Sequence, residues 1–256
     1  ELRFQMHTLS LHRPPVLPTP STNRRWAARR PWPRERAKID GITYKVAESF
    51  AERRAAFELV HDAYTKYGLM DCNGWGLRLS ARHLLPDSAV FVACDGHTVI
   101  STLSLEQECG YDVNQRRADG SRMAEISSLA SRRQHFPQKQ MFDVFLNLVG
   151  LMVAYARFND LERLLIAVHP KHARFYHRLL GFRQIGQQRT YARVSNQPAV
   201  ACVNEFERFD REGCPLKDRL DAMRFQPWEL APRPIPDSER DYFAAAWHSL
   251  TQMPKA

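Results

Sequence analysis

The sequence lacks the patterns that mark disulfide-bonded, metal-binding and membrane-spanning proteins. Its five cysteines are odd in number and none shows C-x-x-C spacing, which argues against a disulfide framework and a zinc site. The histidines form no H-E-x-x-H or comparable pattern, so we expect no bound metal. The most apolar stretch, residues 142–158, is interrupted by polar side chains and shorter than the roughly 20 apolar residues of a membrane span. We therefore predict no transmembrane segment and a reducing, cytoplasmic location.

Evenly distributed positive charge is also missing, although the formal net charge is +9. Residues 1–38 hold nine basic and two acidic residues, which leaves 28 basic and 26 acidic residues in the rest of the chain. We therefore expect no nucleic acid binding through the core, and at most an accessory role of this kind for the N-terminal segment. Because six prolines accompany its arginines, residues 1–38 are predicted to form a disordered basic arm.

Regular hydrophobic periodicity begins after Gly41 and predicts an α/β (α+β) fold. Ser49 and Glu52 form a capping-box pattern for a helix that Gly68 ends, and Asp95-Gly96 predicts a hairpin turn. Hairpins in the first half and crossover helices in the second predict a mixed central sheet with helices on both faces. The expected strands are 42–46, 89–94, 98–106, 123–130, 164–168, 182–185, 190–194 and 200–204, and the expected helices are 49–67, 141–158 and 171–180.

The last part of the chain, residues 207–256, is expected to be a C-terminal helical extension. Helices are predicted over residues 215–225 and 237–252, with the proline-containing stretch 227–236 between them. No chemistry is apparent in this extension, so residues 39–206 are the expected functional domain.

Two segments of that domain resemble a known family of enzymes. The run from His169 to Phe182, HPKHARFYHRLLGF, is similar to the last helix and turn of GNAT acyltransferases, in which a Tyr precedes Gly-Phe. Together with Met123–Ala130, MAEISSLA, and the strand at Pro198, it resembles the N-acyl amino acid synthases of the FeeM type, relatives of the acyl-homoserine lactone synthases. The resemblance covers residues 42–206 and implies the GNAT acyltransferase fold.

This resemblance also implies a reaction. Enzymes of this type move a long-chain fatty acyl group from an acyl carrier protein to the amine of a free amino acid, without an acyl-enzyme intermediate. The expected partners are therefore an acyl carrier protein and a free amino acid. No permanently bound cofactor is expected, because the donor is the acyl-phosphopantetheine of the carrier protein, with acyl-CoA as the other possible donor.

The segment 131–140 departs from the GNAT pattern in a way that bears on the donor. GNAT enzymes that use coenzyme A carry R/Q-x-x-G-x-G/A here, and its backbone N–H groups bind the pyrophosphate. Segment 131–140 contains no glycine, so side chains would obstruct that close approach. A carrier protein has no such requirement and presents an acidic surface, for which Arg132, Arg133 and Lys139 are the expected contacts. The alternative is that these are ordinary solvated loop charges.

Glu125 and Tyr176 are the candidate catalytic residues. Glu125 lies between apolar residues of a predicted strand. Burying a carboxylate there costs free energy unless it has a catalytic role or an ion-pair partner, so we expect Glu125 to act as the general base. Its alternative is a solvent-facing glutamate or one paired with Arg122. By resemblance Tyr176 would protonate the leaving thiolate, and its alternative is a place in the helix core. The carboxylate of the acceptor needs a cation, for which the candidates are Arg82, Arg122 and Arg132.

Two other functions remain open from the sequence. One is an acyl-CoA-dependent GNAT N-acetyltransferase that acts on a small amine or a protein. The other is a non-catalytic GNAT module that binds an acyl carrier.

Overall fold

The protein is built on one eight-stranded sheet. The computed structural model describes residues 38–106, 121–132 and 134–252, so nearly all of the predicted basic arm and Arg133 lie outside the described residues. The strand order is β1-β2-β3-β4-β5-β6-β8-β7, in which only the β5–β6 pair is parallel. The strands are β1 Lys38–Ile39, β2 Ile42–Val46, β3 Ala89–Asp95, β4 Thr98–Glu106, β5 Met123–Ser131, β6 Arg163–Val168, β7 Arg183–Tyr191 and β8 Gln197–Glu205.

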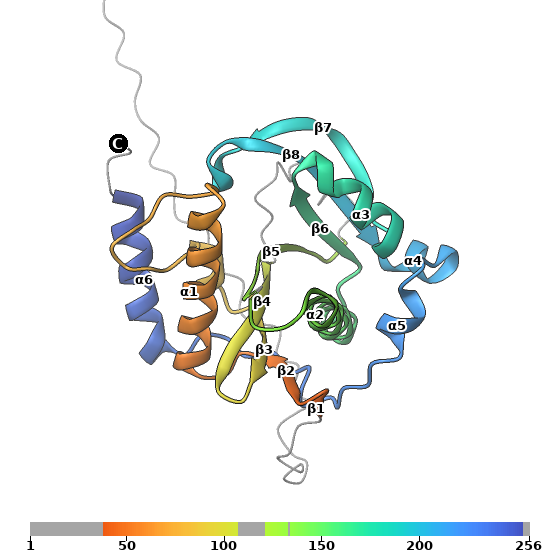
Figure 1. Ribbon diagram of the computed structural model, residues 1–256, viewed down its shortest axis with the longest axis horizontal. Coiled ribbons are helices and arrows are strands. Elements are labelled where there is room, and N and C mark those ends of the chain that lie inside the picture. The colour runs from red at the N-terminus through yellow and green to blue at the C-terminus, as the bar shows by residue number, and fades with distance from the viewer. Residues whose placement is uncertain (1–37, 107–120, 133, 253–256) are drawn as a thin grey trace, which may run out of the picture. The chain divides into compact units, whose positions relative to one another are not determined.

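Helices cover both faces of this sheet, as predicted (Figure 1). The capping box at Ser49 is present, and Gly181 ends α3 in the left-handed conformation at φ 69°. The helices are α1 Phe50–Lys66, α2 Gln138–Phe158, α3 Pro170–Leu180, α4 Phe206–Glu212, α5 Lys217–Asp221 and α6 Asp237–Gln252, with short 3₁₀ turns η1 at Ala81–Leu84 and η2 at Ala192–Val194.

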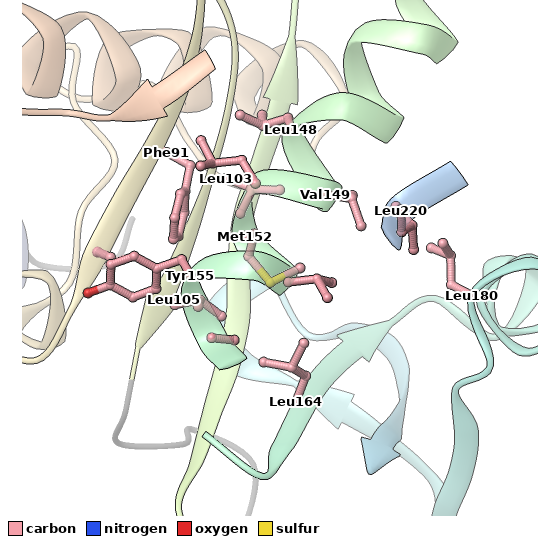
Figure 2. Packing of buried hydrophobic residues seen from close by; sticks show 14 of the residues in the cluster. Phe91, Leu103, Leu105, Leu148, Val149, Met152, Tyr155, Leu164, Leu180 and Leu220 are labelled. Atoms are coloured by element: carbon pink, nitrogen blue, oxygen red, sulfur yellow. The ribbon is translucent and has the colours of Figure 1, made fainter. Parts of the chain in front are cut away.

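The two faces of the sheet carry separate hydrophobic cores. Strand β3 is buried on both faces, with Phe91 packing on the α2 side and Val92 on the α1 side. On the α2 side, Met152 and Tyr155 of the helix meet Leu103 and Leu105 of β4 (Figure 2). Helix α2 is long and apolar enough to cross a membrane, but 67% of its apolar window is buried inside the protein. The apolar side chains of α2 therefore form part of the hydrophobic core.

Strands β5 and β6 pair only over their first halves. The parallel register runs from the Met123–Arg163 pair to the Ile126–Ile166 pair and then stops. Beyond this point β5 bulges against β4, where Ser127 pairs with Ser104 but Ala130 pairs with Thr102. Ser128 has a φ of 56°, the left-handed region that a serine seldom adopts. The middle of β5 is therefore irregular next to the point where the strands part.

The region after α3 differs from the sequence prediction. In place of two strands over 182–185 and 190–194, a single strand β7 runs from Arg183 to Tyr191, and residues 192–194 form the η2 turn. The register shifts between Ile185 and Arg189, so the residues around Gly186 bulge outward and the strand bends. Strand β7 arches over the sheet in Figure 1. The bend was missed because Gly186 interrupts the strand pattern and suggests a break.

The C-terminal extension passes from one face of the sheet to the other. Leu230 belongs to the core on the α2 side, whereas Ile235 and Phe243 belong to the core on the α1 side. Near its start, Met223 occupies the notch at Gly150 of α2, where an added Cβ would lie 2.1 Å from the Met223 sulfur. Residues 36–256 form one compact unit, so the extension and the sheet make one body.

The C-terminal helix was predicted correctly, but the helices before it were not. Helix α6 has the predicted bounds, 237–252. The helix predicted over 215–225 is limited to α5, Lys217–Asp221, and α4 was not predicted. The chain leaves the helix after α5, and Met223 then lies against Gly150 of α2.

A buried ion pair fixes α6 to α1, and its loss should destabilise the fold. Nη1 of Arg53 lies 2.7 Å from Oε2 of Glu239, with 3% and 16% of the two side chains exposed. Replacing Glu239 by Ala leaves a buried guanidinium that retains only backbone acceptors at Arg233 and Pro234, so we expect the free energy of unfolding to fall by about 2–4 kcal/mol. Chemical denaturation measures this.

The matched control for this variant is Asp237→Ala in the first turn of the same helix. Asp237 pairs with Arg240 at the surface, with 90% and 40% of their side chains exposed, and its loss should cost less than about 1 kcal/mol. Equal losses in the two variants would contradict a special role for the Arg53–Glu239 pair.

Candidate active site

Two buried glutamates lie side by side at the centre of the sheet. Glu106 ends β4 and pairs in register with Glu125 of β5, and their relative exposures are 0% and 3%. Directly opposed residues of an antiparallel pair lie on the same face, with Cβ atoms about 5 Å apart. Two carboxylates this close require neighbouring cations and hydrogen-bond donors.

Glu106 is held by four side chains. Nη2 of Arg193 donates to both of its carboxylate oxygens at 2.9 and 3.0 Å. The hydroxyls of Ser127 and Ser80 also donate to it, Ser80 at 3.3 Å, and Nε2 of His83 lies 3.6 Å away. Every oxygen of this carboxylate is therefore hydrogen-bonded.

The pKa values of this cluster follow from burial and charge. Burial opposes ionisation of Glu106 and by itself would raise its pKa. The charges of Arg193 and of His83, when His83 is protonated, have the opposite effect, and so do the hydrogen bonds from Arg193 and Ser127. Together they outweigh burial and lower the pKa of Glu106 to about 2. Burial is the main cause that lowers the pKa of His83 to about 4. At neutral pH Glu106 is thus charged and His83 is neutral.

Glu125 has a different set of neighbours. The hydroxyl of Tyr191 donates to its Oε1 at 2.8 Å. Nη1 of Arg82 lies 3.5 Å and Nη1 of Arg193 lies 3.7 Å from its Oε2. Burial, followed by the charge of Glu125, raises the pKa of Tyr191 above its usual range, so this phenol remains protonated.

The irregular loop between α1 and β3 supplies much of this site. Its η1 turn carries Arg82 and His83, and Ser80 precedes the turn. Nη1 of Arg78 donates to the Ser128 hydroxyl at 3.2 Å, and its Nη2 donates to the carbonyl of Arg193 at 3.1 Å. Arg78 therefore connects the loop to the β5 bulge and to the β7–β8 hairpin.

The charges in this cluster do not cancel. Three guanidinium groups, those of Arg78, Arg82 and Arg193, face two carboxylates, while His83 is neutral at pH 7. Counted over the described side chains alone, the positive charges exceed the negative ones by one. Chemically, the site combines a buried carboxylate with cations that favour a bound anion.

Comparison with known proteins assigns the family. The model of the FeeM family, described as N-acyl amino acid synthase FeeM, matches residues 55–205. The chain belongs to the FeeM family. It is therefore an N-acyltransferase. A comparison with curated proteins finds no match.

A solved structure of the same family confirms the GNAT fold. The structure of FeeM, an N-acyl amino acid synthase from uncultured soil microbes, has a TM-score of 0.57 and 22% identity, covering 70% of this chain and 96% of that one. An acyl-CoA N-acyltransferase from Pseudomonas aeruginosa has a TM-score of 0.47 and 12% identity, covering 64% and 99%. The CoA-dependent acyl-homoserine lactone synthase BjaI, solved with SAM and isopentyl-CoA, has a TM-score of 0.47 and 15% identity. This match covers 67% of this chain and 90% of that one.

In this FeeM-family chain, the predicted catalytic residues lie in different surroundings. Glu125 is in the charged cluster, whereas Tyr176 packs edge-on to Phe175 and Phe182, with ring centroids 5.3 and 6.0 Å apart. Burial, with smaller effects from Tyr64 and Cys202, raises the pKa of Tyr176 to about 12. No contact between Tyr176 and Glu125 is recorded within the described residues.

The predicted arginines are distributed over the domain. Arg82 lies beside Glu125, as described above. Arg122 lies at the start of β5, with 52% of its side chain exposed and Asp160 3.6 Å away. Arg132 is exposed beyond the other end of β5, where its Nε donates to the carbonyl of Val99 at 3.0 Å. Lys139 is exposed in the first turn of α2.

Sequence reasoning missed Glu106, His83, Tyr191 and Arg193. Glu106 follows Leu105 in an otherwise uncharged strand, so the argument that singled out Glu125 applied also to it. The other three carry no comparable signal, because they reach the site only through the η1 loop and the bend of β7. Among the described residues, no three His, Cys, Asp or Glu side chains come close enough to hold a metal ion.

The buried His83 should make the protein less stable in acid. The folded protein keeps His83 neutral down to about pH 4, whereas the unfolded chain takes up this proton near its ordinary pKa of 6.5. Stability is therefore complete above pH 6.5 and falls between pH 6.5 and 4, by about 2–3 kcal/mol. The contribution of Glu106 is lost at lower pH, between its ordinary pKa of 4.5 and about 2.

Denaturant titrations from pH 7 to 4.5 test this prediction. The His83→Gln variant should show a flatter pH dependence, while His97→Gln, a change at an exposed histidine in the β3–β4 turn, should retain the wild-type slope. A wild-type slope in His83→Gln would show that other groups cause the acid sensitivity.

Proposed function

We propose that this protein transfers a long-chain fatty acyl group from an acyl carrier protein to the amine of a free amino acid. The supporting observation is the placement of Glu125, a buried carboxylate beside two arginines and a tyrosine hydroxyl. An amino acid brings an ammonium group that must lose a proton and a carboxylate that needs a cation. Glu125 and Arg82 are placed to meet these two needs, with Arg122 and Arg132 as the more distant predicted candidates.

The proposed donor is the acyl-phosphopantetheine of a carrier protein. Support comes from segment 131–140, which contains no glycine for a coenzyme A pyrophosphate. Arg132 and Lys139 are exposed at this connection, and a carrier protein would meet them together with Arg133. The exposed side chains of Lys171, Arg174 and Arg178 on α3 add positive charge, and none of the three has a recorded carboxylate partner in the described part of the chain.

The proposed reaction is a direct attack on the thioester. Glu125 takes a proton from the ammonium group, directly or through water, and the freed amine forms a bond to the thioester carbonyl carbon. The C–S bond then breaks, giving an amide and a pantetheine thiolate. The nitrogen loses its second proton as the amide forms. Tyr176, protonated at neutral pH, is the proposed proton donor to the thiolate, and this second nitrogen proton, passed through water, restores the Tyr176 hydroxyl. Glu125 returns the first proton to solvent. Backbone N–H groups where β5 and β6 part are the proposed oxyanion contacts.

We also propose a division of the chain by role. Residues 39–206 carry out the transfer, residues 1–38 form an arm outside the chemistry, and residues 207–256 support the domain structurally. The cysteine content favours the cytoplasm as the location of the reaction. An acyl-CoA-dependent acetyltransferase and a non-catalytic carrier-binding module are the competing functions.

The donor is tested by offering two thioesters side by side. Purified protein is incubated with all free amino acids and either palmitoyl carrier protein or palmitoyl-CoA, and N-acyl products are measured by mass spectrometry. We expect products with the carrier protein, because its helical surface is acidic. Products from the CoA thioester alone would overturn the donor proposal, and no product from either would overturn the acyltransfer to amino acids.

The base is tested by replacing Glu125 with Gln. We expect kcat to fall by about 10²–10⁴-fold at neutral pH, because the amide cannot accept the ammonium proton. Glu162→Gln, at an exposed glutamate before β6, is the matched control and should keep the wild-type rate. An unchanged rate in Glu125→Gln would remove this residue from the mechanism.

The proton donor is tested by Tyr176→Phe. This change keeps the ring contacts of Tyr176 but removes its hydroxyl, so kcat should fall by at least about tenfold without loss of folding stability. Steady-state kinetics and thermal unfolding measure the two effects. A full rate would assign Tyr176 to packing alone.

A further inference from the structure

Two arginines from separate elements approach Glu125, and each has an Nη1 atom that makes no hydrogen bond to any described residue. Arg82 comes from the η1 turn and Arg193 from the η2 turn, and their Nη1 atoms lie 3.5 and 3.7 Å from the same oxygen of Glu125. Both distances exceed that of a normal hydrogen bond. Both Nη1 atoms are buried and donate no hydrogen bond within the described residues. Other buried donors of the described chain also lack a hydrogen bond, but these two face the same carboxylate oxygen, an arrangement that suits an acceptor brought by a bound ligand.

Arg193 is held in this position by Glu106. Its Nη2 donates to both oxygens of Glu106, at 2.9 and 3.0 Å, and its Nη1 points toward Glu125. Glu106 is in turn fixed by Ser80 and Ser127, which leaves it little freedom to move. The buried pair therefore sets the direction in which Arg193 presents its remaining donors.

Both arginine side chains reach the surface in part, although their Nη1 atoms are buried against Glu125, so a ligand would have to enter between these atoms and the carboxylate. The side chains of Arg82 and Arg193 are 26% and 22% exposed, compared with 3% for Glu125. Among the described side chains of the cluster, positive charges exceed negative ones by one at neutral pH, and a bound carboxylate would balance this excess. The cations and the carboxylate are less than 4 Å apart, which suits a ligand whose own anion and amine are joined by a single carbon.

We propose that Nη1 of Arg82 and Nη1 of Arg193 form a carboxylate subsite that restricts the acceptor to α-amino acids. The bound carboxylate accepts hydrogen bonds from both guanidinium groups, which places the α-amine against Glu125. Glu106 is a positioning residue, because it acts on the acceptor only through Arg193. This inference rests on the proposed function and adds the residues that determine specificity for the acceptor.

The test compares an amino acid with its α-carboxamide. The amino acid that gives the most product in the panel is used, because its amide has the same side chain and amine but no negative charge. The wild-type protein should prefer the acid. In Arg82→Met, kcat/KM for the acid should fall by about 10–100-fold, mainly through KM, while the amide is little affected. Arg183→Met, at the exposed start of β7 three strands away from β5 and paired with Glu205, should behave as wild type.

Glu106 is tested by two substitutions of different severity. Glu106→Gln should raise KM for the acid with a smaller effect on kcat, and the conservative Glu106→Asp should restore part of the preference for acid over amide. A purely structural role would instead lower the rates with acid and amide equally. That result, or a wild-type protein that accepts the amide as well as the acid, would overturn the subsite.

Binding separates this inference from the proposed function. Calorimetric titration of the protein with the free amino acids and with their α-carboxamides requires no acyl donor. Tighter binding of the acids that Arg82→Met abolishes would support the subsite even if no acyl transfer occurred. Equal binding of acids and amides would overturn it even if acyl transfer were confirmed.

Discussion

The buried ion pair between Glu106 and Arg193 holds the site together. A fully buried carboxylate is stable only with a close cation and satisfied hydrogen bonds, and Arg193 supplies the cation from the far end of the β7–β8 hairpin. To reach it, β7 must bend at Gly186 and end in a tight turn. The same turn brings Tyr191 to Glu125. One electrostatic requirement at the centre of the sheet thus determines the path of its outermost strand.

Local patterns in the sequence predicted most of the architecture. The capping box at Ser49, the Asp95-Gly96 turn and the αL glycine at 181 are short-range signals, and the elements that they delimit lie within a few residues of the predicted bounds. The GNAT resemblance placed these elements in the correct kind of sheet. Where tertiary contacts override local preference, as in the bend of β7 and the short α5, the prediction was wrong.

The site was predictable only where a side chain was unusual in its own segment. Glu125 stood out as a charge between two apolar neighbours, and Glu106 is likewise the one charge in its strand. Arg193 and His83 did not stand out, because their importance depends on what lies beside them after folding. His83 becomes notable only through full burial next to Glu106, and Arg193 only through the hairpin that carries it. Such residues require the fold before they can be recognised.

The C-terminal extension has a consequence for how this chain folds. Arg53 and Glu239 are separated by 186 residues, yet their pair and the aromatic contacts of Phe57 with Phe243 complete the core on the α1 side. During synthesis the apolar surface of α1 stays uncovered until α6 has left the ribosome. Contacts of such long sequence separation slow folding and prolong the exposure of aggregation-prone surface. The apolar face of α1 is therefore protected from self-association only when α6 packs on it.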